Sequence, residues 1–193
     1  AHEAVAQMGE FARENYQLSV ELINQFDAKK LERLNETETA LDKLEGMLDN
    51  YLVKLTDRAL TAEESTKVSE LLHTLSDFER IGDYAVNVSE SAAVLHNRGI
   101  CFSAQAKEEL ACLTGAVGET LEKTLACYHT HQRSTAVQVE PLEEVVDMIA
   151  ADLKNRHIEL LKTGECTIEL GTQFLELLIN LERISDHCSN VAL

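Results

Sequence analysis

The chain has 193 residues, of which 45% are hydrophobic, with one proline, eight glycines and no tryptophan. A protein with so few turn-forming residues cannot be a sandwich or barrel of many short strands, because such folds need glycine or proline between the strands. Thirty-four acidic and 17 basic residues give a net charge of −17, which argues against binding to nucleic acid or to an anionic membrane.

Apolar residues recur at helical spacing along the whole chain, so we expect six long helices. The first is predicted over residues 2–26, and Asp27 can cap a second helix over residues 28–58. Thr61–Glu64 has the sequence of a capping box and opens a third helix, which we expect to end near Gly99.

The second half of the chain repeats this pattern of three helices. Ser103 can cap a fourth helix that runs to about Thr130, and the following residues 131–138 are the least periodic part of the sequence. A fifth helix is predicted after this stretch and ends at Gly164, and a sixth runs from about Thr167 to the end of the chain.

An internal repeat supports this division into three and three helices. Residues 75–88 align with residues 178–191 and are identical at half of the aligned positions. The second and fifth helices also align: Glu38 with Glu143, Asp42 with Asp147, Leu48 with Leu153, Asn50 with Asn155 and Leu55 with Leu160. We therefore predict an all-α tandem repeat of two three-helix bundles, residues 1–99 and 100–193.

Four of the helices carry a Glu-x-x-x-Asp pair, and residues four apart share one face of a helix. The pairs are Glu38/Asp42 and Glu79/Asp83, here called the first patch, and Glu143/Asp147 and Glu182/Asp186, the second patch. All four pairs flank the apolar seam of their helix on the same side. Because each repeat's last two helices form an antiparallel hairpin, with the pairs equally far from the turn, each patch is expected to gather four carboxylates near the surface.

Clustered carboxylates need a counter-charge. Two like charges ~4 Å apart repel by roughly 4 kcal/mol at an effective dielectric constant of ~20. Oxygen donors suit magnesium, calcium, manganese or ferric iron, with zinc as an alternative. Asn87 and Asn190 lie four residues after the last Asp of each patch and are candidates to ligate through oxygen or to hold a ligand water. The alternative is a solvated acidic surface, partly neutralised by Arg80 and Arg183.

Residues 77–87, Asp-Phe-Glu-Arg-Ile-Gly-Asp-Tyr-Ala-Val-Asn, resemble the signature of the PhoU family, and residues 180–190 resemble its second copy. The first copy is most similar to the PhoU-like cytosolic domain that follows the membrane part of bacterial Na/phosphate-cotransporter-related proteins. Two departures stand out. Ser185 replaces the glycine of the first copy, and Pro141 precedes Glu143, where a kink or a late helix start would disturb the second patch.

This resemblance implies two three-helix bundles with multinuclear metal clusters of iron, zinc or manganese on the carboxylate edges, magnesium or calcium being alternatives. It also implies a regulatory role in phosphate uptake and no catalysis. The main expectation is the cytosolic domain of a Na/phosphate-cotransporter-related protein, at the inner face of the cell membrane, with the transporter's membrane domain as its partner in the same chain. The alternative is a stand-alone regulator of a separate phosphate transporter and its sensor kinase, and a homodimer is a further expectation.

Other features fit a cytosolic setting and leave two rival functions open. Five cysteines without a C-x-x-C pair indicate neither a disulfide framework nor a thiolate zinc site, and we find no signal peptide or membrane span. Glu70 and His73 form one Glu-x-x-His pair of the type that di-iron carboxylate enzymes use, but those enzymes need two. A helical adaptor without metal is the second rival.

Overall fold

The computed structural model of the protein describes residues 1–56, 59–130 and 136–192, and within these ranges every regular element is a helix. The helices are α1 (His2–Asn24), α2 (Ala28–Thr56), α3 (Ala62–Arg98), α4 (Ala104–Thr130), α6 (Val139–Thr163) and α7 (Ile168–Ala192). The predicted all-α fold with six long helices is thus confirmed, and α1 ends slightly earlier than expected. The expected end of the second helix at residues 57–58, residues 131–135 of the aperiodic stretch and the last residue lie outside the described residues.

The ends of α3 show the local chemistry that the sequence predicts. The Thr61 backbone N–H donates to Glu64 Oε2 at 2.8 Å, and the Glu64 backbone N–H donates to Thr61 Oγ1 at 3.3 Å, so both halves of the capping box are present. At the other end, Gly99 has a φ of 62°, the left-handed conformation that glycine adopts at little cost. The chain then crosses to the second repeat.

Pro141 marks the start of α6 and does not interrupt it. The helix begins at Val139 and runs without a break to Thr163, so the proline lies in its first turn. Backbone N–H groups in the first turn make no hydrogen bond within the helix, so the N–H that proline lacks is not needed there. The expected kink is therefore absent, whereas the expected late start is real. Helix α6 begins shortly before Glu143, although its counterpart α2 begins well before Glu38.

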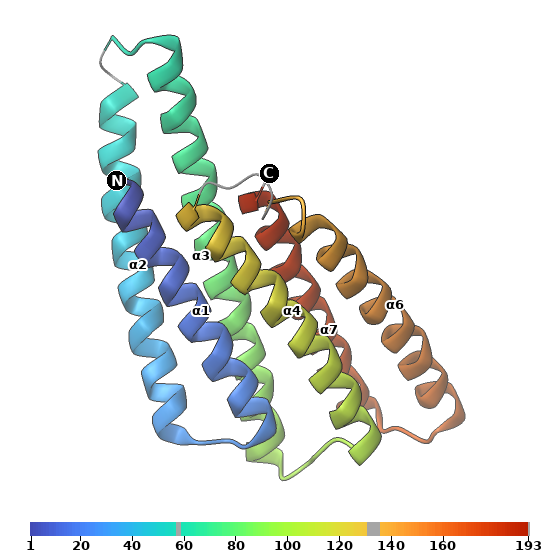
Figure 1. Ribbon diagram of the computed structural model, residues 1–193. Coiled ribbons are helices and arrows are strands. Elements are labelled where there is room, and N and C mark those ends of the chain that lie inside the picture. Colours follow the sequence, from blue (N-terminus) through green and yellow to red (C-terminus); the bar gives the residue numbers. More distant parts are fainter. Residues whose placement is uncertain (57–58, 131–135, 193) are drawn as a thin grey trace.

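The six helices form two three-helix bundles that lie side by side (Figure 1). Helices α1, α2 and α3 pack on one another, as do α4, α6 and α7, and the two bundles meet mainly where α3 packs against α7. The hairpin of α2 and α3 extends beyond the neighbouring helices at the top of Figure 1. Each patch therefore lies on a hairpin of its own, at the two sides of the molecule.

The larger of two apolar clusters joins the repeats. It contains buried side chains from all six helices, including Met8 of α1, Leu41 of α2, Phe78 of α3, Leu121 of α4, Val146 of α6 and Phe174 of α7. Helices α3 and α7 run antiparallel, and their repeat-related residues pair across the interface. Asn87 Nδ2 donates to Asn180 Oδ1 at 3.3 Å, and Asn190 Nδ2 donates to Asp77 Oδ1 at 3.2 Å. The two repeats are thus related by an approximate twofold axis.

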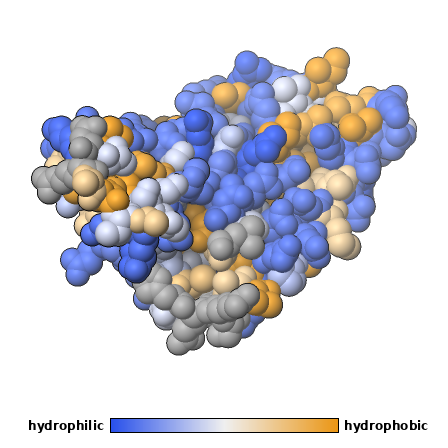
Figure 2. Space-filling view, turned by 90° about the horizontal axis from the view of Figure 1, so that it is seen from above, coloured by the Kyte–Doolittle hydropathy of each residue, from blue (hydrophilic) through white to orange (hydrophobic). Residues whose placement is uncertain are grey.

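The surface is mostly polar. Seen from above, hydrophilic residues cover most of the molecule and smaller hydrophobic areas lie between them (Figure 2). The large apolar side chains that are exposed include Met47 and Tyr51 on α2 and Met148 on α6. Among the described helices, none combines the length and the hydrophobicity needed to cross a membrane.

Candidate metal centres

The first patch is built on α2 and α3, and its deepest carboxylate is that of Glu38. The Glu38 side chain lies against α3 at Gly82, where an added Cβ atom would come within 3.0 Å of Glu38 Oε2. On its other side, the fully buried Asn15 of α1 donates from Nδ2 to Glu38 Oε2 at 2.6 Å. A glycine on one helix and an amide on another therefore hold one carboxylate at the edge of the core.

The carboxylates of the first patch repel one another. Burial, reinforced by the negative charges of Asp42, Asp83 and Glu79, raises the pKa of Glu38 to about 7. Burial and the neighbouring Asp83 raise the pKa of Glu79 to about 7 as well. Burial and Asp83 also raise the pKa of Asp42. All four predicted members of the patch thus act on one another, and the patch holds more negative charge than its surroundings neutralise.

Arginine gives the first patch only partial compensation. Arg80 Nε lies 3.7 Å from Glu79 Oε2, and Arg80 Nη1 lies 3.9 Å from Asp83 Oδ2. The Arg80 side chain is 54% exposed, so solvent weakens both ion pairs. After this partial neutralisation, the first patch is still an oxygen-rich, negatively charged site at the edge between two helices.

The second patch brings three carboxylates closer together. Glu143 and Asp147 of α6 and Asp186 of α7 each offer an oxygen, and these atoms all lie within 4.8 Å of one another. Asp147 Oδ1 is buried and has no hydrogen-bond partner among the described residues. Burial and the neighbouring acids raise the pKa values of Glu143 and Asp147. Pro141 does not move these two residues out of place, because α6 is already helical where they stand.

Glu182 completes the second patch from α7. Burial, followed by the charges of Asp147 and Asp186, raises its pKa. Arg183 Nη1 lies 3.2 Å from Asp186 Oδ2, which corresponds to the pairing of Arg80 with Asp83 in the first repeat. Three of the four carboxylates predicted for the second repeat therefore converge, with Glu182 near enough to feel the charges of two of them, whereas among the described residues the four of the first repeat interact electrostatically without forming so close a group.

Asn87 and Asn190 serve the interface between repeats. Both are exposed, and their amide nitrogens donate to Asn180 and Asp77 on the opposite repeat. His187 Nδ1 also lies 2.8 Å from Asp77 Oδ1. The contacts of the two asparagines are thus with the partner repeat, and their role as metal ligands through the amide oxygen stays a prediction.

Two residues at the first patch were missed by the reasoning from sequence. Asn15 could be found as a polar residue on the apolar face of the first helix. Glu45 is half-buried, and its pKa is raised by burial and then by Asp49, Asp42 and Asp83. Glu45 follows Asp42 by one helical turn, so the same spacing argument that selected the Glu-x-x-x-Asp pairs includes it.

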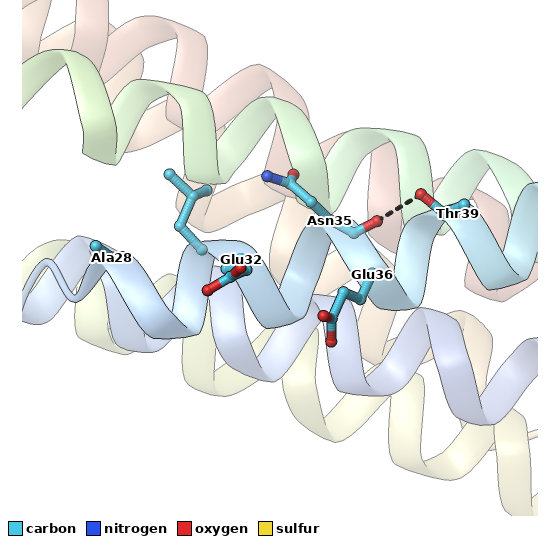
Figure 3. Close-up of a pocket in the computed structure, with 6 residues that line it drawn as sticks. Ala28, Glu32, Asn35, Glu36 and Thr39 are labelled. Carbon is cyan, nitrogen blue, oxygen red and sulfur yellow. Dashed lines mark hydrogen bonds between the residues drawn. The ribbon is translucent and has the colours of Figure 1, made fainter.

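A shallow, open pocket lies elsewhere on α2, near its start (Figure 3). It is lined by Ala28, Leu31, Glu32, Asn35, Glu36 and Thr39. Thr39 Oγ1 donates to the backbone carbonyl of Asn35 at 2.8 Å, which is a local contact within the helix (Figure 3). Because none of the predicted ligands lines this pocket, we consider it separate from the first patch.

The fold and the two patches define a class of protein: an all-α tandem repeat with a carboxylate cluster on the edge of each hairpin. The family model of the PhoU domain matches residues 5–92 and 113–193, one segment in each repeat. The chain belongs to the PhoU family.

Comparisons with individual proteins agree with this family assignment. The chain is 24% identical over 188 residues to a "Phosphate-specific transport system accessory protein PhoU homolog" of Xylella fastidiosa, covering 97% of this chain and 78% of that protein. A homologue of the same description from Streptococcus pneumoniae is 26% identical over 145 residues, covering 72% of this chain and 66% of that one. The crystal structure of PhoU from Pseudomonas aeruginosa superposes with a TM-score of 0.90 at 20% identity, covering 98% of this chain and 90% of the other.

Proposed function

We propose that this chain is a PhoU-type accessory regulator of phosphate transport, which binds metal ions in both carboxylate patches and acts without catalysis. The observation that carries the proposal is that both repeats match the PhoU domain and each has its own carboxylate patch at the corresponding place. In this role the protein would act on a separate phosphate transporter and its sensor kinase from the cytosolic side.

The relatives favour this stand-alone regulator over the cotransporter domain that the sequence motif first suggested. They are described as accessory proteins of a phosphate-specific transport system. The cotransporter domain remains the second candidate, because the Asp-Phe-Glu-Arg-Ile-Gly-Asp form of residues 77–83 carries it. Residues preceding Ala1 in the natural protein would separate the two: a series of membrane spans there supports the cotransporter.

The donor atoms fit hard metal ions. In the second patch, Glu143, Asp147 and Asp186 each offer an oxygen within 4.8 Å of the others, and Asp147 Oδ1 is buried with no partner among the described residues, which supports a metal site there. In the first patch, Glu38, Asp42, Glu79 and Asp83 provide oxygen donors, and Asn15 holds Glu38 in place. Manganese, iron or zinc, or magnesium or calcium, would supply the positive charge that the nearby arginines do not.

The test combines metal content with phosphate uptake. A quadruple amide variant removes two carboxylates from each patch. Its substitutions are Glu79→Gln and Asp83→Asn in the first patch and Asp147→Asn and Asp186→Asn in the second. The matched control removes four exposed acids outside the patches: Glu70→Gln, Glu90→Gln, Glu108→Gln and Asp152→Asn. We expect the patch variant to lose its metal, by elemental analysis, and its control of phosphate uptake in cells, while the matched control keeps both. Normal uptake control in a metal-free patch variant would contradict a role of the metal in regulation.

A homodimer is a separate part of the proposal. Sedimentation of the purified protein over a range of concentrations measures it directly. A constant monomer mass would exclude it and leave the regulatory role intact.

A further inference from the structure

A cysteine and a histidine meet at the turn between α6 and α7, which lies at the lower right of Figure 1. Cys166 Sγ is 3.5 Å from His157 Nε2 and 3.4 Å from the backbone carbonyl oxygen of Thr167. His157 is only 4% exposed, whereas Cys166 is partly exposed. Cys166 is therefore the member of this pair that solvent and small molecules can reach.

Hydrogen bonds at both ends of the turn fix the backbone of Cys166. Gly164 ends α6 in the left-handed conformation, and the Cys166 backbone N–H donates to the carbonyl oxygen of Leu160 at 3.2 Å. Thr167 caps α7, because its Oγ1 accepts from the backbone N–H of Leu170 at 3.3 Å. Cys166 thus stands just before the N-terminus of α7, where the helix dipole favours a negative charge on the sulfur.

His157 occupies a position at which the first repeat has an apolar side chain. The alignment of α2 with α6 places Leu52 opposite His157, and Leu52 is fully buried. Burying a polar ring costs free energy unless its nitrogens find partners. The imidazole stacks on Phe174 with ring centroids 4.2 Å apart, and its Nε2 faces the Cys166 sulfur. Packing alone is satisfied by leucine at this position, so the imidazole adds a chemical capacity that the fold does not require.

The charged groups next to His157 come from α4 and α6. Burial lowers the pKa of His157, and the negative charge of Glu109 on α4 opposes part of that effect. Arg156 Nη1 lies 2.6 Å from Glu109 Oε1, so this carboxylate is paired beside the imidazole. Burial also raises the pKa of the Cys166 thiol. The resting pair is therefore a neutral thiol beside a neutral imidazole, which can accept a proton.

Proton transfer within the pair makes the sulfur nucleophilic. Burial penalises each charge taken alone, but a proton that moves from Sγ to Nε2 leaves two opposite charges about 3.5 Å apart, which attract each other in the partly buried turn. Glu109 favours the imidazolium, and the N-terminus of α7 favours the thiolate. The thiolate is the form of cysteine that attacks a disulfide.

The other cysteines do not share this environment. Among the described residues, the only hydrogen bond between a cysteine sulfur and a histidine is that of Cys166. Cys188 is fully buried, and burial raises the pKa of Cys127. Cys101 and Cys112 are exposed. Cys166 is thus the partly exposed thiol that has a base next to it.

We propose that Cys166 is a site of reversible modification by low-molecular-weight disulfides, with His157 as the base that takes the thiol proton. The Sγ–H bond breaks, the proton moves to Nε2, and Sγ attacks one sulfur of the disulfide. The S–S bond of the disulfide breaks as the new S–S bond forms, and the departing thiolate takes the proton from His157. Cys166 is oxidised to a mixed disulfide, and the other half of the reagent is released as a reduced thiol. This inference depends neither on the metal sites nor on a role in phosphate transport.

The experiment uses the folded full chain and oxidised glutathione as the probe. Cys101→Ser with Cys112→Ser removes the two exposed thiols and gives the parent protein. Mass spectrometry of its peptides after reaction identifies the modified cysteine. We expect a mixed disulfide at Cys166 ahead of Cys127 and Cys188, which dithiothreitol reverses. A parent protein that stays unmodified at Cys166, or reacts first at Cys127, would overturn the inference.

Substitutions of His157 test the base. His157→Leu introduces the residue of the first repeat, and His157→Gln keeps a polar side chain without a base. Both are expected to slow modification of Cys166 about 10-fold or more at pH 7. His73→Leu is the matched control, since His73 is exposed on α3, and it should leave the rate unchanged. Glu109→Gln should slow the reaction by a smaller factor, whereas Glu108→Gln, which removes a neighbouring exposed acid, should not.

The pH profile distinguishes a base from a residue that only shapes the turn. In the parent, the rate should level off above pH 6.5, because the pKa of His157 is lowered from 6.5 and its imidazole is already neutral there. In His157→Leu, the rate should rise about 10-fold per pH unit up to pH 8, as the thiolate fraction of Cys166 does. Equal slopes in the two proteins, with circular dichroism and melting that match, would overturn the role of His157.

Discussion

At the scale of single residues, the contact between Asn15 and Glu38 shows how a carboxylate is held at the edge of an apolar core. Burial and then the neighbouring carboxylates raise the pKa of Glu38, and the hydrogen bond from Asn15 opposes part of that rise by favouring the charged form. Asn15 comes from α1, outside the hairpin that bears the rest of the patch. The position and the protonation of this one carboxylate therefore depend on all three helices of the repeat.

Replacing Asn15 by leucine is expected to lower the free energy of unfolding by about 1–3 kcal/mol, because Glu38 keeps its burial and loses its donor. Urea denaturation in the presence of a chelator measures this change. Asn24→Leu is the control on the same helix, since Asn24 is exposed, and it should change stability by less than about 0.5 kcal/mol. A loss no larger than that of the control would show that the hydrogen bond at 2.6 Å contributes nothing to stability.

The raised pKa values predict a pH dependence of the metal-free protein. Glu38 and Glu79 have pKa values of about 7 in the folded state, against an ordinary value of 4.5. The folded state thus binds protons more tightly than the unfolded state. Stability contributed by these groups is full below pH 4.5 and is lost as the pH rises through 7.

We expect Glu38→Gln with Glu79→Gln to remove this loss, so that the variant gains stability relative to wild type between pH 5 and 8 in chelator. Denaturation at several pH values measures the difference between the two proteins, in which the contributions of groups outside the first patch cancel. A difference that stays constant over this range would contradict the raised pKa values.

At the scale of helices, the position of a proline matters more than its presence. Pro141 lies in the first turn of α6, where a helix tolerates proline, and the carboxylates of Glu143 and Asp147 that follow it remain on the continuous helix. The sequence alone could not distinguish a helix that is kinked at Pro141 from a helix that begins near it, because residues 131–138, which precede the proline, show little periodicity.

Pro141→Ala is expected to change the free energy of unfolding by less than about 1 kcal/mol and to leave metal binding by the second patch unchanged. Met148→Pro provides the contrast, because Met148 is exposed in the middle of the same helix, and this change should cost about 3 kcal/mol or more. Thermal melts and Mn²⁺ titrations of both variants decide this. Loss of metal from Pro141→Ala would mean that the proline positions Glu143 after all.

At the scale of the whole molecule, the two repeats share one core, and α3 and α7 pair across an approximate twofold axis. Tyr84 and His187, which occupy equivalent positions in the two repeats, stack with ring centroids 5.7 Å apart at this interface. Such a core favours unfolding of both repeats in one transition. The exact division into residues 1–99 and 100–193 remains a prediction, since the apolar contacts run across it.

Metal that binds only the folded state is expected to raise the midpoint temperature of this transition. At a metal concentration 100-fold above the dissociation constant, the free energy of unfolding should increase by about 2.7 kcal/mol. The quadruple amide variant should melt at or above the metal-free wild type, because amides keep the shape and remove the repulsion. Calorimetry with Mn²⁺ and with chelator measures both. Two separate transitions would show that the repeats are independent, and an unchanged midpoint with Mn²⁺ would argue against the proposed metal sites.

The sequence by itself determined the helices, their order, the tandem repeat and the pairing of carboxylates on each hairpin, because these follow from local periodicity, capping and turn residues. The tertiary structure decided what depends on contacts between segments distant in the chain. Asn15 reaches Glu38 only when α1 packs on α2, and Asn87 and Asn190 face the other repeat only when α3 packs on α7. Periodicity shows which face of a helix is apolar, but it cannot show which helix covers that face, and the approach of Glu38 to Gly82 is set by that choice.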